Sequence, residues 1–232
     1  ELKGSLFALI LGVTCVFFSA LLRLNTLYQP NSFDVLCWTT FYFVLIKYIN
    51  TDNTKWLFVG ATVFAFGFLN KYNVTFLIIG LIPALVITEQ RKIFGQPKLY
   101  AALVLGLLII APNLLWQYKN NFPVIHHLKE LADTQLVNVD RFEFLKSQLL
   151  FFIGSFFVIL SGWLTLLLYK PFHKYRLFFW SIIFTLVVFM YFKAKDYYAI
   201  GLYPIYISFG SVYLASQLKE GWKRYLQPVL IL

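Results

Sequence analysis

The residues best suited to chemistry in this chain are ionisable side chains at the ends of long hydrophobic runs. They are Asp34, Lys71, the pair His126-His127 and a lysine- and tyrosine-rich cluster at 193–198. A carboxylate at a membrane surface can hold a hydroxyl group or orient a catalytic partner. A lysine at the lipid–water boundary is suited to bind a phosphate, and histidines are candidate ligands of a divalent metal. Their joint function depends on whether the hydrophobic runs place them on one side of a membrane.

The composition is typical of a protein with several transmembrane helices. Of the 232 residues, 60% are hydrophobic and 20% aromatic, and the mean hydropathy is +0.72. Runs approaching the roughly 20 residues that cross a bilayer occupy 5–22, 33–49, 56–69, 74–87, 99–116, 144–168, 177–192 and 200–217, and a ninth begins at Leu226. Backbone polar groups in lipid must be satisfied within their own segment, so we expect helices. The sequence predicts an all-α, polytopic transmembrane helical bundle of about eight spans plus a truncated ninth.

The two ends of the sequence suggest an internal piece of a longer protein. The first residue is Glu1 and not Met, and the chain ends inside an apolar run. We therefore expect residues 1–232 to be part of a transmembrane domain whose N-terminal portion is missing.

The distribution of basic residues predicts the orientation of the bundle. The net charge is +10, but the basic residues lie mostly between apolar runs, so we expect membrane lipid and not nucleic acid as a partner. Twelve of the 20 Lys and Arg fall on one side of the predicted bundle, which marks that side as cytoplasmic. The candidate residues all fall on the other side. This requires 56–87 to be two short helices turning at 70–73, because one long broken helix would place Asp34 and His127 on opposite faces.

A long extracytoplasmic loop is predicted over 117–143. Phe122, Ile125 and Leu128 recur at a spacing of three, which indicates an amphipathic segment on the membrane. His126 and His127 lie in this segment, but two histidines without a third ligand are also compatible with simple interfacial residues. We expect the remaining charged residues of the loop to be solvated: Glu130, Asp133, Asp140, Arg141 and Glu143.

Structural alternatives exist for each of the other candidates. For Asp34 the alternative is stabilisation of the positive end of a helix dipole, and for Lys71 it is a side chain that extends along lipid to the interface. For Tyr197 and Tyr198 the alternative is a role as interfacial anchors. Lys193 and Lys195 lie on the predicted extracytoplasmic side, where basic residues are less common, and binding of a lipid phosphate would explain their position. The sequence contains no nucleotide-binding motif and no HExxH motif.

Four motifs, in order, resemble a known family. They are Asn31-Ser32-Phe33-Asp34 followed by Trp38; Gly60 followed by Gly67-Phe68-Leu69-Asn70-Lys71-Tyr72; Pro112-Asn113-Leu114-Leu115-Trp116-Gln117 followed by Phe122-Pro123; and Lys195-Asp196-Tyr197-Tyr198 followed by Tyr203-Pro204. Together they resemble the bacterial branch of the dolichyl-phosphate-mannose:protein mannosyltransferase-like proteins, which includes the lipid A aminoarabinose transferase.

The resemblance implies a class C glycosyltransferase in the bacterial inner membrane, with its active site at the outer face. Its partners would be a polyprenyl-phosphate-linked sugar and an extracytoplasmic acceptor such as lipid A, a protein or another glycan. No cofactor is clearly required, although the family sometimes uses a divalent metal, for which His126 or His127 would be the ligand. By resemblance, Asp34 is a supporting catalytic carboxylate, and the residues that bind the lipid phosphate are Lys71, Lys129, Lys195, Tyr197 and Tyr198.

One departure from the family concerns the catalytic base. The family carries an acidic motif in its first outer loop, and no Asp-Glu or Asp-Asp pair occurs in this chain. We expect the base to lie upstream of Glu1 and the piece to be inactive alone. Two other functions remain open: a transporter or flippase for a lipid-linked sugar, and a non-catalytic membrane protein.

Overall fold

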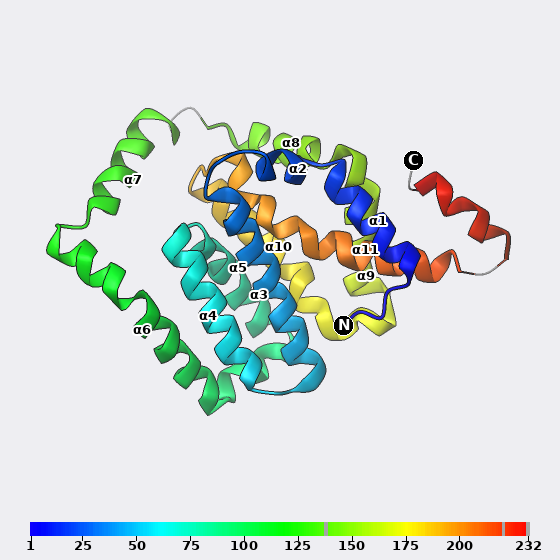
Figure 1. Cartoon of the computed structure of the whole chain (residues 1–232), viewed down its shortest axis with the longest axis horizontal. Helices are drawn as coiled ribbons and strands as arrows, with labels where there is room; N and C mark the ends of the chain where they lie inside the picture. The colour runs from blue at the N-terminus through cyan, green and yellow to red at the C-terminus, as the bar shows by residue number, and fades with distance from the viewer. Residues whose placement is uncertain (137–138, 220, 231–232) are drawn as a thin grey trace.

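Helices make up almost all of the described chain. The computed structural model describes residues 1–136, 139–219 and 221–230, and in these ranges it contains no strand (Figure 1). The predicted all-α fold is confirmed. The α-helices are α1 (Leu6–Phe17), α2 (Ala20–Asn25), α3 (Asn31–Thr51), α4 (Lys55–Asn70), α5 (Val74–Val86), α6 (Pro97–Lys119), α7 (Pro123–Thr134), α8 (Arg141–Phe151), α9 (Phe156–Leu168), α10 (Arg176–Tyr191) and α11 (Tyr203–Gln217). Short 3₁₀ helices are η1 (Glu89–Gly95), η3 (Ile153–Ser155), η4 (Lys170–Tyr175), η5 (Asp196–Leu202), η6 (Gly221–Leu226) and η7 (Pro228–Leu230).

The number of full-length spans is lower than predicted. Each of the eight hydrophobic runs is helical, but four helical segments of the described chain are long and apolar enough to cross a membrane, or up to six if each of two bent pairs is one span. The four are Asn31–Thr51, Pro97–Lys119, Lys170–Tyr191 and Asp196–Gln217. Turns shorten the others: α1 and α4 have 12 and 16 residues, and the run predicted at 144–168 bends by 62° around Phe152. The predicted ninth run begins in the short turns η6 and η7, and its last two residues lie outside the described chain.

The predicted turn at 70–73 is present, and it gives the bundle two distinct ends. Within this turn, Lys71 bonds to Asn31 and Asn73 bonds to Asp34, both at the start of α3. We call this the site end. The opposite end, which we call the basic end, is marked by Asn50 near the end of α3, whose side-chain oxygen accepts hydrogen bonds from Lys174 and Tyr175. Gln90, which follows α5, bonds to the Lys174 carbonyl there, so α5 runs from the site end to the basic end.

The helices α9 and α11 pack closely against each other. These helices cross at Gly162 and Gly210, where an added Cβ on Gly162 would overlap the Tyr206 carbonyl oxygen and one on Gly210 would overlap the Val158 carbonyl oxygen. Backbones in lipid-embedded bundles approach this closely where small residues line the contact. The α9–α11 pair, with α1 packed on α11, supports the segment that carries Tyr197 and Tyr198.

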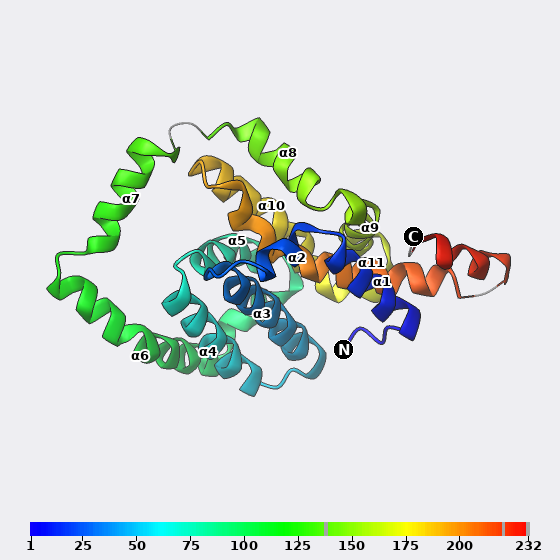
Figure 2. The same ribbon diagram turned by 45° about the horizontal axis from the view of Figure 1, so that its top comes forward.

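The connection predicted as a long loop is mostly helical. It contains the end of α6, the whole of α7 and the start of α8. Figures 1 and 2 show α6 and α7 along one side of the molecule, with α7 apart from the other helices. No residue of α7 is buried, which agrees with an amphipathic helix whose apolar side chains, Ile125 and Leu128, are exposed.

Candidate active site

Asp34 is a buried carboxylate whose two oxygens are both hydrogen-bonded. It lies in the first turn of α3 and is 5% exposed. Oδ1 accepts from the indole Nε1 of Trp38 at 3.1 Å, and Oδ2 accepts from Nδ2 of Asn73 at 2.8 Å. A carboxylate in a first helical turn is also stabilised by the helix dipole. The arrangement fixes the position of Asp34 and leaves it suited to orienting its neighbours.

Lys71 projects from the turn between α4 and α5 into a cradle of tyrosines. Its Nζ donates to Oδ1 of Asn31 at 2.6 Å and lies 4.1 Å from the ring centroid of Tyr198 and 5.2 Å from that of Tyr197. Ring faces attract cations electrostatically. Partial burial lowers the pKa of Lys71 to about 8, against the opposing effect of Asp34 and with a smaller repulsion from Lys195. We call Asn31, Asp34, Lys71, Asn73, Tyr197 and Tyr198 the Lys71 cluster.

Buried amides hold the tyrosine segment, η5, against the rest of the cluster. Nδ2 of Asn73 donates a second bond to the Tyr198 carbonyl at 3.0 Å. On the other side of η5, Nε2 of Gln148 in α8 donates to the Asp196 carbonyl at 2.9 Å. The indole of Trp38 packs against Gly201, where an added Cβ would lie 2.7 Å from the ring. Four segments distant in sequence therefore fix one small region at the site end.

A third group of polar residues ties the start of α7 to the Lys71 turn. The hydroxyl of Tyr72 donates to Oδ1 of Asn113 at 2.9 Å and accepts from Nε2 of Gln117 at 2.9 Å. Oε1 of Gln117 accepts from the backbone N–H of Val124 at 3.3 Å. Residues of the second and third sequence motifs are therefore in direct contact, although the sequence alone gave no reason for this pairing.

The remaining candidates lie on or beside α7. His126, His127 and Lys129 are exposed on this helix, outside the Lys71 cluster. Lys195 connects the two regions, because its Nζ donates to Oε1 of Gln135, directly after α7, at 2.5 Å. Within the described ranges, no group of three or more His, Cys, Asp or Glu side chains could hold a metal ion.

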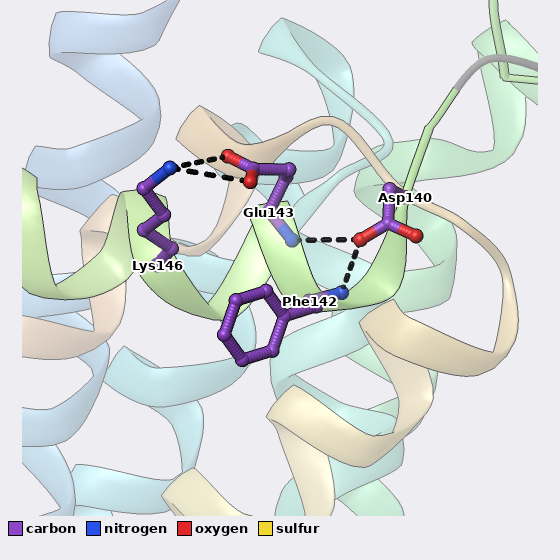
Figure 3. Close-up of polar contacts among 4 residues, drawn as sticks. All are labelled: Asp140, Phe142, Glu143 and Lys146. Carbon is purple, nitrogen blue, oxygen red and sulfur yellow. Dashed lines mark hydrogen bonds and ion pairs between the residues drawn. The ribbon is translucent and has the colours of Figure 1, made fainter.

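Two charges expected to be solvated in the loop, Asp140 and Arg141, are exposed and also organise the start of α8. Asp140 caps this helix, with its Oδ1 accepting from the backbone N–H of Phe142 at 2.7 Å and of Glu143 at 2.9 Å (Figure 3). These bonds lower the pKa of Asp140. Arg141 donates to the Met190 carbonyl at 3.1 Å, which joins α8 to the end of α10. Glu143 pairs with Lys146 on the surface.

The sequence motifs did not identify three buried amides as parts of the site. Asn31 and Asn73 each bond a charged member of the cluster, and Gln148 holds η5. Asn31 is part of the first motif and Asn73 directly follows the second, but the sequence assigned no role to either. A glutamine within a predicted apolar span was the one available signal for Gln148, since an amide in lipid requires an internal partner.

The comparison with known proteins supports the family predicted from the sequence. Residues 2–116 match the model of the family described as dolichyl-phosphate-mannose-protein mannosyltransferase. The chain is mannosyltransferase-like over this stretch. The predicted family resemblance is confirmed, and with the apolar helices it indicates a membrane protein of the glycosyltransferase type. Asp34 and Lys71 lie inside the matched stretch, whereas the histidine pair and the Lys195–Tyr198 segment lie outside it. No curated protein matches the chain, and no solved structure does.

Proposed function

We propose that this protein transfers a sugar from a polyprenyl-phosphate donor to an extracytoplasmic acceptor such as lipid A, a protein or another glycan. The observation that carries the proposal is the position of Lys71 at one end of the bundle, a half-buried cation that donates to Asn31 and lies over two tyrosine rings. Such a group matches a lipid phosphate in charge and in depth. The family match over residues 2–116 supports a lipid-linked donor.

The proposed reaction is a direct displacement at the anomeric carbon. The acceptor hydroxyl oxygen forms the new bond to this carbon while the bond from the carbon to the phosphate oxygen breaks, and the polyprenyl phosphate leaves with the bonding electrons. The hydroxyl proton passes to a carboxylate acting as general base. Lys71 and Lys195, with Lys129 supplied from α7, would stabilise the negative charge that develops on the phosphate.

Asp34 fits a positioning role better than that of the base. Both of its oxygens already accept hydrogen bonds from buried donors, and the side chain is 5% exposed, so an acceptor hydroxyl has little access to it. We propose that Asp34 orients the Lys71 turn through Asn73 and Trp38, and that a carboxylate outside the Lys71 cluster takes the proton. His126 and His127 remain candidate ligands if the protein uses a divalent metal.

The proposed orientation places the site end outside the bacterial inner membrane. Lys47, Lys55, Lys92 and Lys174 gather around the last turn of α3 at the basic end, and basic residues favour the cytoplasmic side. Tyr197 and Tyr198 would then face the extracytoplasmic surface, where tyrosine rings are also common interfacial residues.

A single assay on the full-length protein in sealed vesicles tests the proposal. Radiolabelled polyprenyl-phosphate sugar and a lipid A, peptide or glycan acceptor are supplied, and transfer, movement of the lipid across the bilayer and binding are measured separately. We expect transfer, and we expect Lys71→Ala and Lys195→Ala to lower it without unfolding the protein, while the matched control Lys170→Ala at the basic end leaves it unchanged. Movement of the lipid without transfer would indicate a flippase. The absence of both movement and transfer would indicate a non-catalytic membrane protein. Wild-type transfer in both site-end variants would remove the role of these lysines.

A further inference from the structure

An apolar cavity lies between α3, α4, α5, α6 and η1, away from the Lys71 cluster. Its volume is about 280 Å³. For scale, an apolar cavity of about 150 Å³ stays dry and holds a benzene ring, so this cavity has room for a segment of hydrocarbon chain. It extends along α3 from Phe41 to Tyr48, toward the basic end of the bundle.

Small residues on α4 and α6 create the space. Gly60, Ala61 and Gly106 all line the cavity. A Cβ added to Gly60 would meet no atom closer than Val44 Cγ1 at 3.6 Å. Leu103, Leu107 and Ile82 also line the cavity and are exposed on the outside of the bundle. The cavity is therefore accessible from the side, where the hydrocarbon of a bilayer would lie.

Two polar groups in the cavity wall lack partners. Tyr48 and Trp56 both line the cavity, and within the described chain the hydroxyl of Tyr48 and the indole Nε1 of Trp56 are buried without a hydrogen bond. Tyr48 is 1% exposed. Buried polar groups in native proteins nearly always have a partner. Both groups can donate, so the missing partner is an acceptor at the basic end of an otherwise apolar site.

A hydrogen-bond acceptor on a membrane lipid would lie at the same depth in the bilayer as Tyr48 and Trp56. Tyr48 is in the last turn of α3 and Trp56 in the first turn of α4, where the helices reach the membrane–water interface. Tryptophan and tyrosine favour this level of a bilayer, which is also where the ester carbonyls of a glycerolipid lie.

Positive charge surrounds the same end of the cavity. The ammonium groups of Lys47 and Lys55 lie 5.5 and 5.1 Å from the ring centroid of Trp56. Arg91 and Lys92 are exposed on η1 directly before Ile93, which lines the cavity. Glu1 pairs with Lys47, and Asp52 lies 3.6 Å from Lys92, so the local charge is positive but partly neutralised. Lysines at this depth attract anionic lipid headgroups.

We infer that this cavity binds one acyl chain of an anionic glycerophospholipid from the bilayer. The chain enters between α5 and α6, an ester carbonyl accepts hydrogen bonds from Tyr48 and Trp56, and the phosphate lies among Lys55, Arg91 and Lys92. This lipid would occupy the end of the bundle opposite the proposed donor site, so the inference does not depend on the proposed function.

The test measures lipid retention and stabilisation in the purified protein. The protein is extracted in mild detergent, its bound lipids are quantified by mass spectrometry, and thermal unfolding is followed with phosphatidylglycerol or phosphatidylcholine added. We expect about one phosphatidylglycerol per chain and a rise in the unfolding midpoint with phosphatidylglycerol alone. Recovery of a polyprenyl phosphate in its place, equal effects of the two lipids, or no effect of either would overturn the inference.

Substitutions locate the lipid within the molecule. Gly60→Leu fills the cavity, and Lys55→Gln with Lys92→Gln removes charge at its mouth, whereas Lys170→Gln, on the same end but outside the cavity wall, is the matched control. Tyr48→Phe should fold normally, since it removes only an unpaired hydroxyl, so a change in lipid binding can be attributed to the site. We expect it to weaken phosphatidylglycerol binding by about tenfold, the order of one lost hydrogen bond. Unchanged binding in Tyr48→Phe and in the double lysine variant would refute the site.

Discussion

The side-chain amide of Asn73 donates to the carboxylate of Asp34 at 2.8 Å, and the same nitrogen donates to the Tyr198 carbonyl at 3.0 Å. One buried amide thus joins α3, the turn before α5 and the segment η5. Lys71 lies two residues before this amide, and its tyrosine cradle lies on the other side of it. The geometry around the candidate phosphate-binding lysine consequently depends on a residue that has no chemical role of its own.

The first prediction concerns this contact. Asn73→Ala should lower the free energy of unfolding by about 1–3 kcal/mol, because it leaves one buried oxygen of Asp34 without its donor. Chemical unfolding of the purified protein in detergent measures the change. Asn120→Ala is the matched control, since Asn120 is exposed and its amide bonds only within the end of its own helix, to Trp116. Equal stability of the two variants would show that the Asn73 contact does not support the fold.

The second prediction concerns the crossing of α9 and α11. Gly162→Ala and Gly210→Ala should each destabilise the protein by about 1–3 kcal/mol or more, because the added methyl group meets a backbone carbonyl that cannot move independently. Gly95→Ala is the control, since an added Cβ there has no atom within 4 Å. The midpoint of thermal unfolding distinguishes them. If Gly162→Ala and Gly210→Ala have the same unfolding midpoint as Gly95→Ala, the two helices do not pack as closely as described.

The third prediction concerns the cap of α8 shown in Figure 3. Hydrogen bonds from two backbone amides lower the pKa of Asp140 below its usual 3.8, so the capped form is stable above that pH and is lost as the pH falls through the lowered value. Asp140→Ala should speed amide hydrogen exchange in 141–144 at neutral pH. Asp140→Asn should preserve protection, because asparagine is an equally good cap. Similar exchange in the alanine and asparagine variants would contradict a capping role.

Continuous hydrophobic runs were sufficient to predict the helices but not their lengths. The eight runs, the turn around Lys71 and the amphipathic segment with Ile125 and Leu128 all follow from local sequence. The break at Phe152 and the separation of η5 from α11 do not, because the apolar run continues through both of them. A run of apolar residues reports burial in lipid or protein and carries no information on where a helix bends.

The candidate site was predictable only in part for a related physical reason. Asp34, Lys71 and Tyr198 were evident as polar residues beside apolar runs. Their contacts run through the amides of Asn31 and Asn73, and an amide has no charge or periodicity that distinguishes a buried bridging residue from a helix cap. The pairing of Lys195 with Gln135 depends on where α7 lies, which local sequence does not determine.

The last prediction concerns the ionisation of Lys71. Burial lowers the pKa of Lys71 from 10.5 to about 8, so the folded protein loses this proton before the unfolded chain does. Its contribution to the unfolding free energy should therefore rise with pH between these values. Binding changes in the opposite direction, because the cation that a lipid phosphate requires is lost as the pH passes about 8. Binding of a polyprenyl phosphate, measured by fluorescence quenching or calorimetry from pH 6.5 to 10, should weaken above pH 8. Lys71→Arg should extend binding to higher pH, because arginine stays charged throughout this range. If the wild type and the arginine variant lose binding at the same pH, another group controls the affinity and Lys71 does not contact the phosphate.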